Sequence, residues 1–110
     1  MAYNREDYDP VSTFDHEQVV VGATPASLSA SLYDVPQGGG PAKLALIQVL
    51  DAAIYFTLDG TTPSSTNGQV VEPSTDPRSL VVVWGSPDIR NFRALRRDAA
   101  DAKLNVRYSR

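Results

Sequence analysis

The sequence contains no cysteine, and this absence excludes several kinds of function at once. A disulfide framework, a thiol nucleophile and a cysteine-ligated zinc site all depend on that residue. A chain without cysteine also fits assembly in a reducing cytoplasm. With 110 residues, the chain is expected to form one domain of modest stability, which association with neighbouring molecules would raise.

Groups that could carry catalysis are scarce as well. His16 is the only histidine, and a Ser-His-Asp set built on it is a weak alternative to an exposed residue, because nothing else marks a nucleophile. The aspartates lie mostly in turns, where this residue type usually caps the backbone. The sequence has no EF-hand loop, phosphate-binding glycine loop or HExxH motif. We therefore predict no enzymatic activity, cofactor or metal site. Asp51, Asp59 and Asp76 could meet around a calcium ion, but nothing in the sequence requires it.

Long apolar runs are also missing. The longest, from Ala42 to Leu50, contains Lys43 and Gln48 and is too short to cross a bilayer. The first residues are acidic and polar, so we expect no signal peptide and no membrane association.

Charge is distributed unevenly along the chain. Residues 1–87 hold three basic and ten acidic residues, whereas residues 88–110 hold seven basic and three acidic ones. The simplest interpretation is solvated charge on exposed strands. The alternative is a basic surface that meets an acidic one, such as the N-terminal segment of a neighbouring copy. Nucleic acid is not the expected partner, since the chain is acidic overall and shows no recognition helix or RNA-binding motif.

Residues 1–16 are predicted to form an extended N-terminal arm, because neither strand nor helix periodicity holds there. Disordered tails are poor in aromatics, yet this segment carries Tyr3, Tyr8 and Phe14, so we expect it to dock on its own domain or on a neighbour. The candidate protein-interface residues are these three aromatics together with Arg93, Arg96, Arg97 and Arg107.

From residue 17 to residue 110 the pattern has a period of two, which predicts strands with one buried face. Spacing of ten to fifteen residues between turn signals is typical of a sandwich or barrel. We predict an all-β domain, a single antiparallel β-sandwich of about eight strands. The expected strands start near residues 18, 28, 43, 54, 69, 80, 91 and 103.

The aromatic residues within the domain are divided by their phase in these strands. Trp84 is in phase with Leu80 and Val82, so we expect it to pack at the edge of the core. Tyr33 and Tyr55 are expected to point away from the inner faces and to be available for contacts. An exposed aromatic face would also suit a bound sugar.

The segment Tyr55 to Ser64, YFTLDGTTPS, resembles a strand-turn unit known from two settings. One is the β-sandwich at the C-terminus of chitobiase-like glycosidases, where a Tyr-Thr-x-Asp-Gly-x-x-Pro stretch recurs. The other is a group of small structural proteins of tailed bacteriophages, in which the turn is followed by a glycine, here Gly68, and by two final strands. The second resemblance covers residues 18–108 in order and is the better of the two.

The phage resemblance implies a virion structural protein, assembled in the host cytoplasm as a homo-oligomer such as a trimer. Its expected role is to bind the major capsid protein as a decoration (cement) protein that stabilises the head shell. A place in the head-tail connector, neck or tail is the first alternative. A carbohydrate-binding module is the second, and it follows from the glycosidase resemblance.

Overall fold

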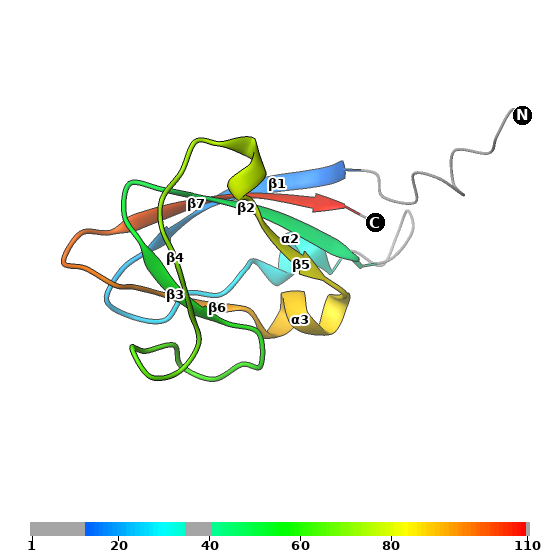
Figure 1. Ribbon diagram of the computed structural model, residues 1–110. Helices are drawn as coiled ribbons and strands as arrows, with labels where there is room; N and C mark the ends of the chain where they lie inside the picture. The colour runs from blue at the N-terminus through cyan, green and yellow to red at the C-terminus, as the bar shows by residue number, and fades with distance from the viewer. Residues whose placement is uncertain (1–12, 35–40, 110) are drawn as a thin grey trace, which may run out of the picture.

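The computed structural model describes residues 13–34 and 41–109, which form two antiparallel sheets packed face to face (Figure 1). The four-stranded sheet has the order β1-β7-β2-β5, and the three-stranded sheet has the order β4-β3-β6. The predicted all-β sandwich is confirmed. The strands are β1 (Thr13–Val21), β2 (Leu44–Leu50), β3 (Ile54–Thr57), β4 (Gln69–Val71), β5 (Val81–Trp84), β6 (Arg93–Arg96) and β7 (Ala102–Ser109).

Strand β7 shows why the period-two pattern produces this fold. It pairs with β1 on one side and with β2 on the other, so it lies in the middle of its sheet. Leu104, Val106 and Tyr108 are buried, whereas Lys103 and Arg107 are exposed. The alternation expected for a strand with one face on the core is therefore confirmed here.

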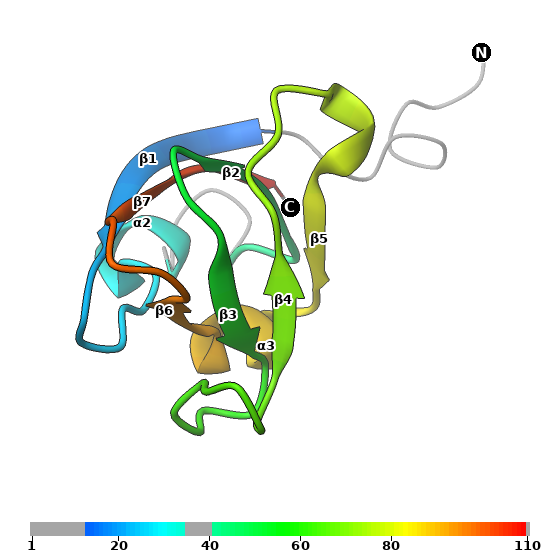
Figure 2. The same cartoon turned by 60° about the vertical axis from the view of Figure 1, so that its left-hand side comes forward.

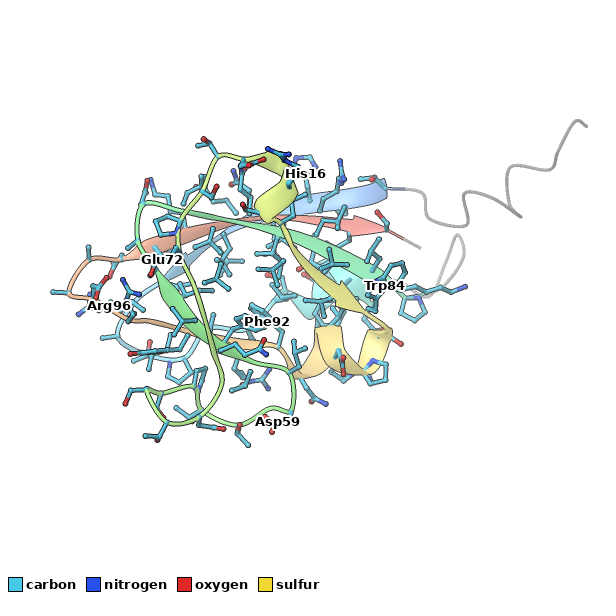
Figure 3. All side chains as sticks on the ribbon, in the orientation of Figure 1. His16, Asp59, Glu72, Trp84, Phe92 and Arg96 are labelled. Atoms are coloured by element: carbon cyan, nitrogen blue, oxygen red, sulfur yellow. The ribbon has the colours of Figure 1, made fainter. Side chains whose placement is uncertain are left out.

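The core fills the space between the two sheets. Phe56 of the three-stranded sheet stacks on Phe92, with ring centroids 5.8 Å apart. Figure 3 shows Phe92 between the two sheets, and its side chain is only 1% exposed. Ile47 and Leu104 approach the core from the four-stranded sheet and are fully buried.

Two short helices and a 3-10 turn complete the fold: α2 (Ala30–Tyr33), η1 (Pro77–Ser79) and α3 (Ser86–Asn91). Figure 2 places α2 beside β1 and β7, and shows β1 and β5 at opposite margins of the curved four-stranded sheet. Within the described part of the chain, no helix has the length and apolar character needed to cross a membrane.

The strand predicted from residue 28 is absent, so the described residues form seven strands. Only an isolated bridge between Ala26 and Ala94 is present, and the chain then turns into α2. The backbone N–H and the hydroxyl of Ser29 both donate to the Glu17 carboxylate, at 3.0 and 2.7 Å, which draws this segment out of the ladder. Tyr33, expected to face solvent, is instead buried at 6% exposure.

The phase predicted for β5 is also wrong. Val81 and Val83 face the core, and Val82 and Trp84 face solvent, with Trp84 64% exposed. A run of three valines is apolar in both phases, so its composition cannot decide which face is buried. The ladder with β2 decides it, because Val83 pairs with the fully buried Ala45.

The first strand begins earlier than its expected start near residue 18. Residues 13–16, assigned above to the arm, belong to β1, and His16 pairs with Arg107. The rest of the predicted arm lies outside the described residues.

Candidate functional site

Three of the four exposed large hydrophobic residues in the described part of the chain, Val20, Val82 and Trp84, lie on the outer face of the four-stranded sheet, meaning the face turned away from the three-stranded sheet. Strand register places Val82, Leu46, Arg107 and His16 in one row across β5, β2, β7 and β1. Trp84 lies in the next row, opposite Leu44. The outer face is thus apolar at Val82, Trp84, Leu44 and Leu46 of β5 and β2, and it becomes polar on β7, where Arg107 lies.

A shallow hollow of about 320 Å³ lies in this face. Leu46 and Leu80 supply apolar walls, and Leu80 follows directly on η1. The polar wall includes Gln18 and Asn105, whose side chains are joined by a hydrogen bond of 2.9 Å. Its full lining is His16, Glu17, Gln18, Leu46, Gln48, Leu80, Asn105, Val106 and Arg107.

This hollow does not assemble a catalytic set from the described residues. Its lining includes His16 but no serine, threonine or cysteine. Its one carboxylate, that of Glu17, is engaged by Ser29 and by the hydroxyl of Tyr108. The described surroundings of His16 therefore contain no activated nucleophile.

Val82 and Trp84 place two large apolar side chains on the outer face of β5, where they are exposed. They are 45% and 64% exposed, and they stand on a strand at the margin of the sheet. Tryptophan is enriched among the residues that dominate binding energy at protein interfaces. Exposed apolar side chains that adjoin one another mark interaction sites more often than single ones do.

A buried polar cluster supports this face from beneath. The Tyr108 hydroxyl donates to the Glu17 carboxylate, and the rings of Tyr108 and Tyr33 lie 5.9 Å apart. Burial raises the pKa of the Tyr108 phenol well above its ordinary value of 10.0, and the hydrogen bond to Glu17 raises that pKa further. Glu17 thereby ties β1, β7 and the α2 segment together.

The raised pKa of Tyr108 makes stability depend on alkaline pH. Above about pH 10 the unfolded chain releases the phenol proton while the folded protein retains it, so the free energy of unfolding falls as pH rises, by up to about 1.4 kcal/mol per pH unit. We expect Tyr108→Phe to flatten this slope in urea denaturation between pH 8 and 11.5. Tyr55→Phe, at a half-buried tyrosine of the other sheet, should retain the slope. An unchanged slope in Tyr108→Phe would contradict this assignment.

The arginines singled out in the sequence are not brought together. Arg93 donates to the carbonyl oxygens of Arg90 and Phe92, at 3.1 and 2.8 Å. Arg96 pairs with Asp101 at 2.6 Å. Of the four, only Arg107 lies on the outer face, and Figure 3 shows Arg96 at the opposite end of the molecule from Trp84.

Arg97 is the most heavily paired of these arginines. Hydrogen bonds to Asp98 and Glu72 raise the pKa of its guanidinium, and its Nη1 lies 2.5 Å from Glu72. The basic segment at the end of the chain is therefore partly neutralised by acids of the same chain. Of the candidate aromatics, Phe14 belongs to β1, and Tyr3 and Tyr8 lie outside the described residues.

The turn that carries the resemblance is organised by its own side chains. The Asp59 carboxylate accepts from the Thr61 hydroxyl and backbone N–H, which lowers the Asp59 pKa. The Asn67 amide donates to Thr61 and Thr62, at 2.9 Å each. These bonds give the turn a structural role.

Asp51, Asp59 and Asp76 do not converge on one point. Asp51 lies 3.6 Å from Lys103, and Asp76 caps η1 by accepting from the Arg78 backbone. No group of three or more metal-ligating acids or histidines occurs in residues 13–34 and 41–109.

Comparisons with protein-family models, with curated proteins and with solved structures found no match. The interpretation of the site therefore depends on the geometry above. Sequence reasoning missed Trp84 and Val82 because it placed them on the inner face. The sequence does indicate this ambiguity, because three consecutive valines are compatible with either face of the strand being buried.

Proposed function

We propose that this protein is a virion structural protein that binds the capsid surface as a decoration protein and stabilises the head shell. The observation that carries the proposal is the exposed apolar surface formed by Val82 and Trp84, on the same face as the hollow and Arg107, with Leu46 between Val82 and Arg107. Such a surface suits contact with another protein, with an aromatic anchor and a polar rim. The resemblance to phage structural proteins supplies the kind of partner, the major capsid protein.

Copy number in purified particles separates this role from its nearest rival. A shell protein is expected in many copies per particle, because it repeats with the capsid lattice. Recovery of a dozen copies or fewer would favour the neck or tail instead. Complete absence from washed particles would refute both.

Binding to the particle should depend on Trp84. Truncation of a central aromatic anchor typically costs 2 kcal/mol or more, so Trp84→Ala is expected to lower affinity for particles lacking the protein by roughly 30-fold or more. Co-sedimentation with such particles over a range of protein concentrations measures this. Val70→Ala is the matched control, since Val70 is 48% exposed on β4 of the other sheet. Equal losses in both variants would contradict the proposed surface.

The exposure of Trp84 also favours a second candidate, a carbohydrate-binding module, because sugars stack on exposed aromatic faces. Titration of chitin oligosaccharides or alginate against tryptophan fluorescence tests it directly, since Trp84 is the single tryptophan. No change in emission at millimolar sugar would remove this candidate.

A further inference from the structure

The four margins of the two sheets are protected to different degrees. Exposed sheet edges invite pairing with other chains, and proteins usually blunt them with charges, prolines, very short strands or covering segments. β1 carries charge along Asp15–Glu17, and β4 is only three residues long and is followed by Glu72 and Pro73. β6 is covered, since Ala26 and Ala94 exchange two backbone hydrogen bonds of 2.8 and 2.9 Å.

β5 is protected only by its length of four residues, one more than β4, and by Gly85 and Pro87 just beyond its end; within the described residues nothing covers it. Its sequence, VVVW, has no charge, proline or glycine, and β2 is the only described strand that pairs with it. All four of its residues are β-branched or aromatic, which favours strand pairing.

The backbone groups on the open side of β5 can be assigned. The Gly85 N–H donates to the Lys43 carbonyl at 2.7 Å, so Gly85 faces β2. Backbone groups alternate in direction along a strand, so those of Val83 also face β2. The N–H and carbonyl groups of Val82 and Trp84 then point away from β2, toward the open side.

We propose that β5 pairs antiparallel with β5 of a second copy of this chain, about a two-fold axis at Val83. In that register the backbone of Val82 exchanges two hydrogen bonds with the partner's Trp84, and symmetry repeats the exchange. On the outer face each tryptophan side chain then lies against the partner's Val82. Cross-strand pairs of aromatic and β-branched side chains stabilise sheets.

Charge at the two ends of β5 supports a second copy as the occupant. Arg78 precedes β5, with its side chain 90% exposed and 3.4 Å from the Asp76 carboxylate of its own chain, and Asp88 follows β5 in the first turn of α3. Antiparallel pairing brings the start of one β5 beside the end of the other. Each Arg78 is thereby directed toward the partner's Asp88, at both ends of the contact.

The contact is small and should be weak. Three paired residues per copy give four hydrogen bonds, and interfaces below about 1,200 Å² are generally weak or transient. The inference rests on the proposed function in one respect: a repeated shell protein needs only modest affinity between copies, because many contacts act together.

Sedimentation equilibrium and tryptophan emission, both recorded from 5 µM to 1 mM protein, test the pairing. We expect dimer to form with rising concentration and the Trp84 emission to shift to shorter wavelength in parallel. Val82→Lys places a charge on the strand edge and should weaken dimerisation at least tenfold. Val20→Lys is the control: Val20 is 58% exposed on the same face but lies on β1, so dimerisation should persist. Both variants should keep the wild-type circular dichroism and urea midpoint.

Three results would overturn the pairing: a monomer with unshifted emission up to 1 mM, dimerisation that survives Val82→Lys, or short-wavelength emission from a protein that sediments as a monomer at 5 µM. Failure of the proposed function looks different. If wild-type protein dimerises through β5 but never binds particles, the decoration role is contradicted and the pairing is not. If wild-type protein binds particles but stays monomeric, the pairing is contradicted and the decoration role is not.

Discussion

Replacing Gly68 with alanine is expected to lower the free energy of unfolding by about 3 kcal/mol and the Tm by roughly 15 °C. Gly68 has φ +112°, a conformation that residues with a side chain rarely adopt. A Cβ there would lie 2.5 Å from the carbonyl oxygen of Phe56, a backbone atom held in β3. The loss therefore combines backbone strain with a steric clash, and thermal unfolding by circular dichroism measures it.

Two other glycines serve as graded controls for this substitution. Gly60 also has positive φ, +83°, but a Cβ there would meet only Asn91 at 3.6 Å, so Gly60→Ala should cost about 1 kcal/mol. Gly22 lacks positive φ, and its nearest neighbour would be Asp101 at 3.5 Å, so Gly22→Ala should be nearly neutral. Equal losses at Gly68 and Gly60 would show that the close approach to β3 is not what requires glycine.

Glu17→Ala is expected to cost about 3 kcal/mol, because it leaves the buried Tyr108 hydroxyl and the Ser29 backbone N–H without their acceptor. Hydrogen bonds to a charged group contribute roughly 1.5–3 kcal/mol each, and a buried donor left unpaired adds its desolvation cost. Urea denaturation at pH 7 measures the loss. Glu17→Gln keeps an acceptor oxygen and should cost less.

Glu72→Ala is the matched control for a carboxylate on the surface. Glu72 is 67% exposed in its ion pair with Arg97, and exposed ion pairs contribute little to stability because solvent screens them. Similar losses at Glu17 and Glu72 would contradict the role assigned to the buried cluster.

Strand β7 and the segment that begins at Ser27 show which parts of the fold can be predicted from the sequence. Alternation from Lys103 to Tyr108 is unambiguous, so β7 and its buried face were predicted correctly. The segment that begins at Ser27 alternates just as cleanly, yet it turns into α2. The cause is a carboxylate twelve residues earlier, Glu17, which binds Ser29. A hydrogen bond over that separation leaves no trace in local periodicity.

The candidate site was harder to predict from the sequence than the fold, for two reasons. The count of basic residues places four arginines in one group: Arg93, Arg96, Arg97 and Arg107. In the structure the first three bind carbonyl or carboxylate groups of their own chain, and only Arg107 lies on the outer face. Trp84 was assigned to the core because a valine run carries no phase of its own. The pairing with β2 determines which residues of β5 are buried. Such pairing joins residues far apart in the chain, so it cannot be predicted from a short window of sequence.

The proposed decoration role requires the protein to contact the capsid through β5 and the outer face of the four-stranded sheet. Amide hydrogen exchange of free and particle-bound protein tests it most directly. We expect slower exchange on binding at Val82 and Trp84, whose N–H groups point to the open side of β5 in the monomer, with little change in the turn from Asp59 to Asn67. Protection confined to that turn, or no protection in β5, would contradict it.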